Sequence, residues 1–236
     1  MRLTDEFRKG VNGILNGQGR QLASKWAKTA ALLSHPRIAP HIPPTRLFSG
    51  PNLHSMLFAY GIVVIKPVRG AGGHGVIKVS REGGTYTYTY YATQRRFNSF
   101  KGLLRALRSR QRGRRYIIQR GIRLATIAGR PIDYRVKHVK LGDTWVIRAM
   151  VGRLARRGLF VTNLCRGGTL LSAREGIGRS LSRRMVSRKK SEMRALTRTA
   201  TAVLESRYPG IGQLGFDYGI DRLGKIWIFE VNTRPQ

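Results

Sequence analysis

The sequence GFDYGIDRLGKIWIFEVNTRP, residues 215–235, contains the strongest structural signal in the chain. Two apolar runs, 213–221 and 225–231, predict neighbouring strands joined by a turn. The second run encloses Glu230, which is unusual in a protein with 45 Lys and Arg against 11 Asp and Glu. Because side chains alternate along a strand, Glu230 and Asn232 are expected on the same face.

A candidate cation site follows from these two strands. It consists of the carboxylates of Asp217 and Glu230 and the amide oxygen of Asn232. Hard oxygen donors of this kind suit Mg²⁺, which takes a few protein oxygens together with substrate phosphates. The alternative is that both acids form salt bridges with the surplus arginines, since buried acids in a basic protein readily find cationic partners. The two strands alone leave both interpretations open.

A glycine-rich loop connects the β-branched run at 60–68 to a second expected strand at 74–80. Its sequence, KPVRGAGGHGV (66–76), places Lys66 at the end of the first strand. Glycines allow positive φ and let backbone N–H groups approach a phosphate, and a lysine adds a point charge. Neither the Walker A nor the Rossmann pattern fits, because both require a helix directly after the glycines. A flexible hairpin turn explains the loop equally well.

The remaining patterns predict an α+β protein of two lobes that divide near residue 120. The strand 85–91, TYTYTYY, presents one tyrosine face. Further strands are expected at 116–119, 133–141, 143–151 and 160–164, and helices at 21–33, 99–111 and 191–208. We therefore expect a lead segment at 1–20, an N-terminal lobe at 21–119 and a C-terminal lobe at 120–236.

Polar residues of the C-terminal lobe form a second group of candidates. Asp133 and Arg135 share one face of the strand that begins DYRV, and Arg148, Arg153 and Asn163 follow. Arginines on strands beside a nucleotide would neutralise the charge that develops in phosphoryl transfer. Taken singly, each arginine is better explained as an ordinary solvated cation, because basic residues are so numerous in this chain.

Composition limits the class of protein. The chain has 236 residues, of which 41% are hydrophobic, a formal net charge of +34 and one cysteine, Cys165. It is long enough to bury a core, and a single cysteine excludes an intramolecular disulfide framework and a Cys-rich zinc site. Since the sequence contains neither a long apolar run nor a signal peptide, we expect a cytoplasmic protein without a membrane span. The charge favours anionic partners, including phosphates and nucleic acid.

Taken in order, these motifs resemble an ATP-grasp domain over roughly residues 20–236. The segments SKWAKTAALLSHPRIAPHIPPT and VVIKP resemble those that carry the two ATP lysines of that superfamily. The resemblance implies Lys25 and Lys66 as these lysines, with Lys28 as the weaker candidate for the first. RGAGGHGV resembles the flexible loop that covers the triphosphate. Its implied phosphate contacts are Gly70, Gly72, Gly73 and Gly75.

The C-terminal half is similar to RimK-type ligases. The short segments SKW, IPPT, FVTNLCRGG and IWIFEVN most resemble the YheC/YheD spore-coat-associated group. YIIQRGI resembles the inter-lobe hinge whose backbone holds adenine. The implied nucleotide contacts are Gln119, Arg120, Gly121, Asp133, Arg135 and Asn163. Arg153 is the implied catalytic contact to the phosphoryl or acyl-phosphate group. The implied ligands of Mg²⁺ or Mn²⁺ are Asp217, Glu230 and Asn232.

The resemblance implies a carboxylate–amine ligase that forms an acyl phosphate from ATP and releases ADP, with a link to the spore coat or cell envelope. Neither Cys165 nor His74 needs a catalytic role in that reaction. An anionic acceptor substrate or polymer is expected because the chain is strongly cationic. The main alternative is a non-catalytic ATP-binding protein of the spore surface. A nucleic-acid-binding module is less favoured, because the basic residues lack an interleaved aromatic platform, and no sequence-specific nucleic acid is expected.

Overall fold

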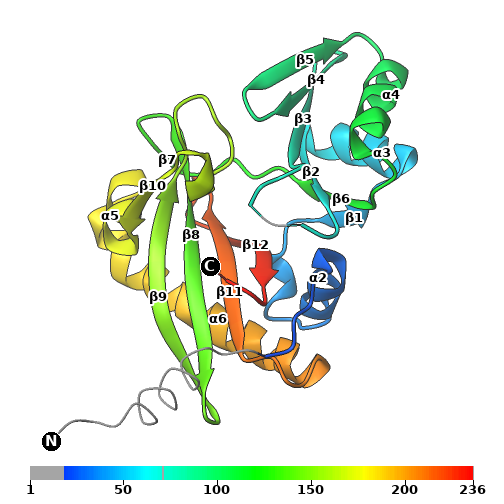
Figure 1. The fold of residues 1–236 in the computed structure, drawn as a ribbon. Coiled ribbons are helices and arrows are strands. Elements are labelled where there is room, and N and C mark those ends of the chain that lie inside the picture. The colour runs from blue at the N-terminus through cyan, green and yellow to red at the C-terminus, as the bar shows by residue number, and fades with distance from the viewer. Residues whose placement is uncertain (1–18, 71, 236) are drawn as a thin grey trace, which may run out of the picture.

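A computed structural model of the protein describes residues 19–70 and 72–235. Residues 1–18 of the expected lead segment 1–20 lie outside the described residues, as does Ala71 of the glycine loop. The described chain forms two antiparallel sheets, each covered by helices, as Figure 1 shows. The α+β class expected from the sequence is confirmed. No helix among these residues is both long and apolar enough to cross a membrane.

The first sheet is built from residues 45–120. Its strand order is β1 (Thr45–Leu47), β6 (Tyr116–Arg120), β2 (Ile62–Pro67), β3 (Ile77–Glu82), β4 (Thr85–Tyr90) and β5 (Thr93–Phe97). The helices α3 (Gly50–Tyr60) and α4 (Phe100–Gln111) cover one face. Alternate strand residues such as Val63, Ile65 and Tyr88 turn toward these helices and are buried. The intervening residues, including Lys66 and Lys78, therefore lie on the opposite face.

The second sheet is built from residues 126–232. Its strand order is β10 (Thr169–Ser172), β9 (Thr144–Leu154), β8 (Arg130–Leu141), β11 (Gln213–Ile220) and β12 (Ile226–Asn232), and β7 (Thr126–Ile127) pairs with β8. The helices α5 (Ala173–Ser180) and α6 (Val186–Arg207) pack against it. Short 3₁₀ turns are η1 (Ala39–His41), η2 (Leu164–Arg166) and η3 (Arg183–Met185).

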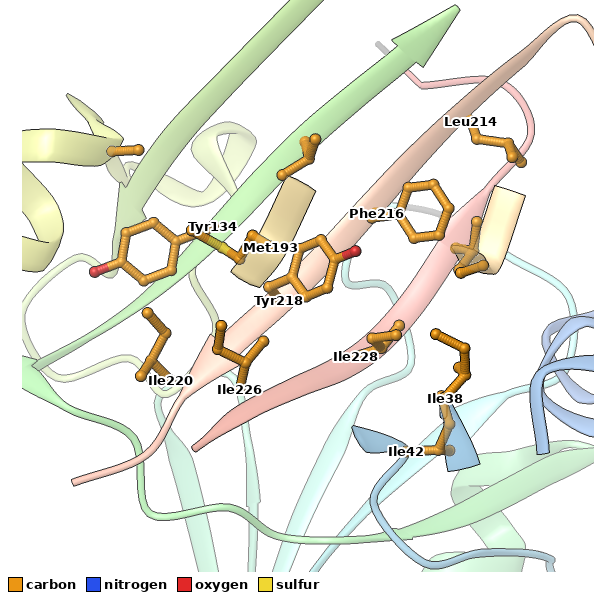
Figure 2. Packing of buried hydrophobic residues seen from close by; sticks show 14 of the residues in the cluster. Ile38, Ile42, Tyr134, Met193, Leu214, Phe216, Tyr218, Ile220, Ile226 and Ile228 are labelled. Carbon is orange, nitrogen blue, oxygen red and sulfur yellow. The ribbon is translucent and has the colours of Figure 1, made fainter. Parts of the chain in front are cut away.

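The core of the second sheet is aromatic at its centre. Figure 2 shows Tyr134 of β8 and Phe216 and Tyr218 of β11 beside Met193 of α6. The hydroxyl of Tyr218 lies 2.8 Å from Oγ1 of Thr197, so its polar end has a partner inside the core. This packing fixes β8 and β11, the two strands whose other side chains approach the candidate site.

The helix α2 (Lys25–Leu33) precedes the first sheet in the chain but packs with the second. Its residue Leu32 belongs to the same buried cluster as Ile228 of β12. Ile38 and Ile42, from the segment that follows α2, join this cluster, as Figure 2 shows. The helix that the sequence assigns to the N-terminal lobe is therefore attached to the core of the other lobe.

Local hydrogen bonds set where α2 begins. The side chain of Ser24 caps the helix by accepting a hydrogen bond from the backbone N–H of Ala27 at 3.2 Å. The expected helix at 21–33 accordingly starts only at Lys25. Before the cap, the backbone N–H of Leu22 donates to Oγ1 of Thr233 at 2.8 Å. This bond joins the first described residues to the segment directly after β12.

Most expected elements are confirmed, with shifts of a few residues at their ends. The confirmed strands correspond to β2, β3, β4, β6, β8, β9, β11 and β12, and the confirmed helices to α2, α4 and α6. The elements not foreseen are α3, α5, β1, β5, β7 and β10. The tyrosine face expected for this strand is also confirmed in β4, and two of its residues, Tyr86 and Tyr88, are buried.

The strand expected at 160–164 is wrong. Residues 160–163 are irregular and continue into η2, where the N–H of Arg166 donates to the carbonyl of Asn163 at 2.9 Å. The side chain of Thr162 bonds to β8 of the second sheet, because its hydroxyl donates to the Asp133 carboxylate at 2.6 Å. The segment therefore packs over the sheet and does not extend it. The β-branched residues that suggested a strand are instead part of a loop between β9 and β10.

Candidate functional site

A cavity of about 1190 Å³ is lined by residues of both sheets and collects nearly all the residues that the motifs single out. Its walls come from the open face of the first sheet, the glycine loop, β8, β9, the loop 156–165, β11 and β12. Of the candidates, Gly75 does not line it, and neither do Lys28 and Arg148. The others are Lys25, Lys66, Gly70, Gly72, Gly73, Gln119, Arg120, Gly121, Asp133, Arg135, Arg153, Asn163, Asp217, Glu230 and Asn232. The structure therefore brings these residues together, while the role of each stays a prediction.

The structure separates the two candidates for the first lysine. Lys25 lines the cavity, and its Nζ lies 3.1 Å from Oε1 of Glu230 and donates to the carbonyl of Gly70. Lys28 is turned away, because its Nζ donates to the carbonyl of Leu22 at 2.7 Å. Burial lowers the pKa of Lys28 to about 8, although the Glu230 carboxylate acts in the opposite direction. Of the two, Lys25 has the position suited to a ligand contact.

Lys66 is held at the end of β2 by neutral groups. Its Nζ donates to Oε1 of Gln119 at 2.7 Å and to the carbonyl of Phe229 at 3.4 Å. Burial lowers the pKa of Lys66 from its ordinary value, while the Glu230 carboxylate opposes this shift. An anionic ligand in the cavity would therefore stabilise the charged form of a buried ammonium whose direct partners are uncharged oxygens.

The glycine loop adopts backbone conformations that residues with a side chain rarely adopt. Gly70, Gly72, Gly73 and Gly75 all have positive φ, with values from 65° to 138°. At Gly73 a Cβ atom would lie 2.5 Å from Oδ1 of Asn163, so the absence of a side chain also allows close contact between the lobes. Gly75 is placed behind the cavity wall, where a Cβ would meet the Tyr116 hydroxyl at 3.0 Å.

A cluster of polar contacts joins the glycine loop to η2 of the other lobe. The guanidinium of Arg166 donates to the hydroxyl of Tyr91 at 2.8 Å and lies 3.0 Å from Nδ1 of His74. It also stacks over the Tyr91 ring, 4.4 Å from its centroid. The thiol of Cys165 donates to the carbonyl of Gly72 at 3.7 Å. His74 and Cys165 thus position the loop in this structure.

A buried network of charges forms the floor of the cavity. The guanidinium of Arg153 donates to both carboxylate oxygens of Asp133, at 2.8 and 2.6 Å, and lies 2.9 Å from Oδ1 of Asp217. Arg135 donates to both oxygens of Asp217, at 2.5 and 3.0 Å. Burial raises the pKa of Asp133, although Arg153 opposes the shift. Burial acts to lower the pKa of Arg153, but the Asp217 and Asp133 carboxylates outweigh it and raise that pKa.

The predicted metal donors are close together. Asp217 and Glu230 are direct partners in the register of β11 and β12, and Nδ2 of Asn232 lies 3.5 Å from Oδ2 of Asp217. The expected placement of these donors on adjacent strands is confirmed. Among the described residues no group of three or more His, Cys, Asp or Glu side chains is arranged to hold a metal. Two carboxylates and an amide fit Mg²⁺ in their chemistry, as a site completed by substrate phosphates.

Gln119 and Arg120 end β6 of the first sheet, and Gly121 begins the segment 121–125 that leads to the second sheet. The side chain of Gln119 lies between Lys66 and the Thr45 hydroxyl, to which it donates at 3.2 Å. The guanidinium of Arg120 stacks 5.2 Å from the centroid of Tyr60. The N–H of Gly121 donates to the carbonyl of Ile62 at 2.9 Å, and a Cβ here would lie 2.5 Å from the Ile62 side chain. The backbone at Gly121 is thereby held close to β2, and a side chain here would require Ile62 to shift.

Several cavity residues were not singled out by the sequence. Thr162 contributes a hydroxyl to Asp133, and nothing in the local pattern distinguishes it from a strand residue. The additional basic residues that line the cavity are Lys78, Arg123, Arg130, Arg156, Arg222 and Arg234. In all, eleven Lys and Arg and three Asp and Glu line the cavity. The lining of the cavity is therefore strongly cationic, a charge balance that attracts anions.

Known proteins match the chain along nearly its whole length. A model of the family described as YheC/D-like ATP-grasp matches residues 17–236. The endospore coat-associated protein YheD of Bacillus subtilis (strain 168) is 32% identical over 220 residues, which are 90% of this chain and 48% of YheD. The endospore coat-associated protein YheC of the same organism is 27% identical, over 92% of this chain and 61% of YheC. The chain thus spans about half to three fifths of these relatives.

Solved structures share the fold at low sequence identity. D-cycloserine synthetase DcsG matches with a TM-score of 0.59 and 15% identity, over 89% of this chain and 62% of that protein. N5-carboxyaminoimidazole synthase of Aspergillus clavatus, solved with ADP and 5-aminoimidazole ribonucleotide, matches with a TM-score of 0.57 and 13% identity. That match covers 92% of this chain and 46% of the synthase. At identities this low, the matches show that the fold is similar and nothing more.

Proposed function

Because the chain belongs to the YheC/D-like ATP-grasp family and has the ATP-grasp fold, we propose that it is an ADP-forming carboxylate–amine ligase that uses ATP and Mg²⁺. The solved relatives named above are synthases and synthetases, one of them with ADP bound. Residues 21–119 and 120–236 are proposed as the lobes that enclose the nucleotide, with α2 attached to the core of the second lobe.

The observation that carries the proposal is the convergence of two lysines from separate elements. Lys25, at the start of α2, and Lys66, at the end of β2, both reach the segment Phe229–Glu230 of β12. The glycine loop lies beside them, since Lys25 also donates to the carbonyl of Gly70. Two ammonium groups, a glycine loop and two carboxylates in one cavity provide what a nucleoside triphosphate with a divalent cation needs.

In the proposed mechanism the chain acts by positioning and by neutralising charge. Lys25 and Lys66 hold the α- and β-phosphates, and backbone N–H groups of the glycine loop cover the triphosphate. Arg153, kept in orientation by its two hydrogen bonds to Asp133, faces the transferring phosphoryl group. Mg²⁺, when bound through Asp217, Glu230 and Asn232, supplies further neutralisation of the phosphate charge.

The proposed reaction has two steps. An oxygen of the substrate carboxylate attacks the γ-phosphorus, the bond to the β-phosphate oxygen breaks, and ADP leaves. The amine then attacks the acyl carbon, the C–O bond to phosphate breaks, and the amine loses a proton as phosphate leaves. The carboxylate substrate is proposed to be anionic beyond its reacting group, because the cavity is lined by eleven basic and three acidic residues.

A second candidate function is a non-catalytic ATP-binding protein associated with the spore coat. The names of YheD and YheC as endospore coat-associated proteins favour it. So does the pairing of Asp217 with both Arg135 and Arg153, because arginines at a metal carboxylate weaken its hold on a cation. For either candidate we propose synthesis and nucleotide binding in the cytoplasm, with association with the coat following.

Thermal unfolding tests the nucleotide proposal. ATP with Mg²⁺ should raise the Tm of the wild type, because a ligand that binds only the folded state stabilises it. Lys66→Ala and Glu230→Gln should largely abolish the shift. Lys101→Ala, an exposed lysine on α4, is the matched control and should retain it. Absence of any shift in the wild type at millimolar ATP would refute nucleotide binding.

Product release distinguishes the two candidates. ADP formation should be followed with a panel of amino acids, short acidic peptides and cell-wall fragments as acceptors. Release of ADP that depends on one acceptor and one amine supports the ligase. If the whole panel gives no ADP while the Tm shift with ATP persists, the non-catalytic candidate replaces it.

A further inference from the structure

We propose that Arg135 is a built-in counter-cation of Asp217, which gives up its place only when nucleotide phosphates arrive, so that divalent cations bind this protein together with the nucleotide and not before it. The inference rests on the proposed function, because it concerns the same carboxylates. It goes beyond that function by assigning Arg135 a role in the free protein and by predicting the order in which ligands bind.

Both carboxylate oxygens of Asp217 already contact nitrogen atoms of other side chains. Oδ1 lies 2.5 Å from Nε of Arg135 and 2.9 Å from a terminal nitrogen of Arg153. Oδ2 accepts from Arg135 at 3.0 Å and lies 3.5 Å from Nδ2 of Asn232. Two guanidinium groups therefore occupy the positions that a metal ion would take on this side chain.

The second carboxylate also has a cation of the chain in contact, at one of its two oxygens. Oε1 of Glu230 lies 3.1 Å from Nζ of Lys25. The three acids of the cavity, Asp133, Asp217 and Glu230, are thus matched by three cations in direct contact, which are Arg153, Arg135 and Lys25. A divalent ion added to this arrangement would bring two positive charges to carboxylates that are already neutralised, at separations where repulsion is strong.

Of the two arginines on Asp217, Arg135 is the one placed to leave. Arg153 is also bound to both oxygens of Asp133 and its side chain is 7% exposed. Arg135 is 18% exposed, and the side-chain hydrogen bonds that it makes in the described chain both go to Asp217. Withdrawal of Arg135 therefore breaks one ion pair, whereas withdrawal of Arg153 would leave the buried Asp133 without its cation.

Phosphates supply Arg135 with another partner. Its side chain lines the cavity, as do Lys25 and Lys66. A guanidinium binds two phosphate oxygens with the same fork of donors that it now offers to Asp217. When a nucleoside triphosphate enters with its divalent cation, the cation replaces Arg135 on Asp217 and the phosphates accept Arg135. After the exchange, Asp217 is paired with the divalent cation and Arg135 with the phosphates. If the cation entered alone, Arg135 would be left without an anionic partner.

Binding of Mn²⁺ to the protein without nucleotide, followed by electron paramagnetic resonance, tests this assignment. The wild type should hold Mn²⁺ only weakly, with a Kd above about 1 mM, because cations already neutralise the carboxylates. Addition of ADP should produce a tightly bound Mn²⁺ signal. Arg135→Gln should bind Mn²⁺ at least about tenfold more tightly than the wild type with no nucleotide present.

Lys137→Gln is the matched control. Lys137 lies two residues further along β8 on the same face, and its loss changes the net charge by the same amount without touching the cavity. Its Mn²⁺ affinity should equal that of the wild type. Equal gains in the Arg135 and Lys137 variants would mean that general charge, and not the Arg135–Asp217 pair, controls metal binding, and would overturn the proposal.

Other outcomes are equally decisive. Tight Mn²⁺ binding by the nucleotide-free wild type overturns the proposal even if Arg135→Gln does not fold, because that measurement needs no variant. Arg135→Lys keeps the charge but loses the two-donor fork, and its gain should be smaller than that of Arg135→Gln. If ATP and ADP fail to bind any variant while Arg135→Gln still gains Mn²⁺ affinity, the proposed function and the exchange with nucleotide phosphates fail, and the role of Arg135 as counter-cation of Asp217 stands alone.

Discussion

Lys25 and Glu230, which come from the first helix and the last strand of the described chain, meet with their charged atoms 3.1 Å apart. Their side chains are 8% and 19% exposed, so water screens the pair only in part. This ion pair connects α2 to β12 at the edge of the cavity, and it links the stability of the fold to the charge of the candidate site.

A double-mutant cycle with Lys25→Met and Glu230→Gln measures this link. We expect a coupling of about 1–2 kcal/mol in the free energy of unfolding, because the pair is largely shielded from water. The exposed pair Arg179–Glu175 on α5, with charged atoms 2.7 Å apart, is the control. Its coupling should stay below about 0.5 kcal/mol. Similar couplings for the two pairs would show that burial adds nothing at Lys25.

Lys28 should make stability depend on pH above neutrality. Burial lowers its folded pKa to about 8, so between that value and the unfolded 10.5 the unfolded chain binds more protons and stability rises with pH. From about pH 7.5 to about pH 9.5, wild type should gain about 2 kcal/mol relative to Lys28→Met in urea unfolding. A difference between the two proteins that stays constant across this range would contradict the lowered pKa.

The loop glycine Gly73 should be intolerant of a side chain for two reasons. Its φ of 71° disfavours L residues, and a Cβ would lie 2.5 Å from Oδ1 of Asn163. Gly113 has a φ of 73° with nothing within 4 Å of its Cβ position, so Gly113→Ala isolates the backbone effect. We expect Gly113→Ala to cost about 1 kcal/mol in the free energy of unfolding and Gly73→Ala clearly more.

Nucleotide affinity separates the two glycine variants further. Gly73→Ala should weaken ATP binding, because the contact with Asn163 must open, whereas Gly113→Ala should leave the Kd for ATP unchanged. Isothermal titration calorimetry on both variants gives the comparison. Equal effects on stability and on Kd would mean that the Gly73–Asn163 approach is incidental.

The contacts of Arg166 should control the mobility of the glycine loop. Arg166→Ala removes the hydrogen bond to Tyr91 and the contact with His74, so the amides of residues 72–76 should exchange with solvent several-fold faster. Hydrogen exchange followed by mass spectrometry reports this segment directly. Arg157→Ala, an exposed arginine in the same connection between β9 and β10, should leave the exchange unchanged. Protection that survives the loss of Arg166 would assign the loop's order to its glycine turns.

Regular patterns made much of the fold predictable from the sequence. The alternation in β4, the β-branched run of β2 and the largely apolar runs of β11 and β12 identify strands, because burial of one or both faces requires these side chains. The helix α3 was not foreseen, because its signals are short ones, an N-cap at Ser49 and Pro51 in the first turn. The strand expected at 160–164 failed because Thr162 bonds to a side chain and not to a neighbouring strand.

The candidate site was predictable as a set of residues but not as a set of bonds. The order of the motifs places Asp217, Glu230 and Lys66 in one cavity, as observed. Sequence spacing does not show whether a carboxylate there holds a cation from the chain, because Arg135 lies opposite Asp217 on the adjacent strand β8, and that register depends on the whole sheet. The two interpretations left open for Asp217 are therefore compatible, since it faces the cavity and is ion-paired with arginine. Its metal role stays a prediction.

The hydrogen bond between Leu22 and Thr233 spans 211 positions of the sequence. During synthesis α2 leaves the ribosome among the first elements described here, yet its binding surface on β12 is made last. Until then its apolar face, including Leu32, has only part of its native surroundings, because α2 packs against β12 as well as α6. The first sheet, whose contacts are closer in sequence, is able to form in the meantime. The packing of α2 is therefore completed late in synthesis. The cavity is complete only when β12 has been made and Glu230 can pair with Lys25.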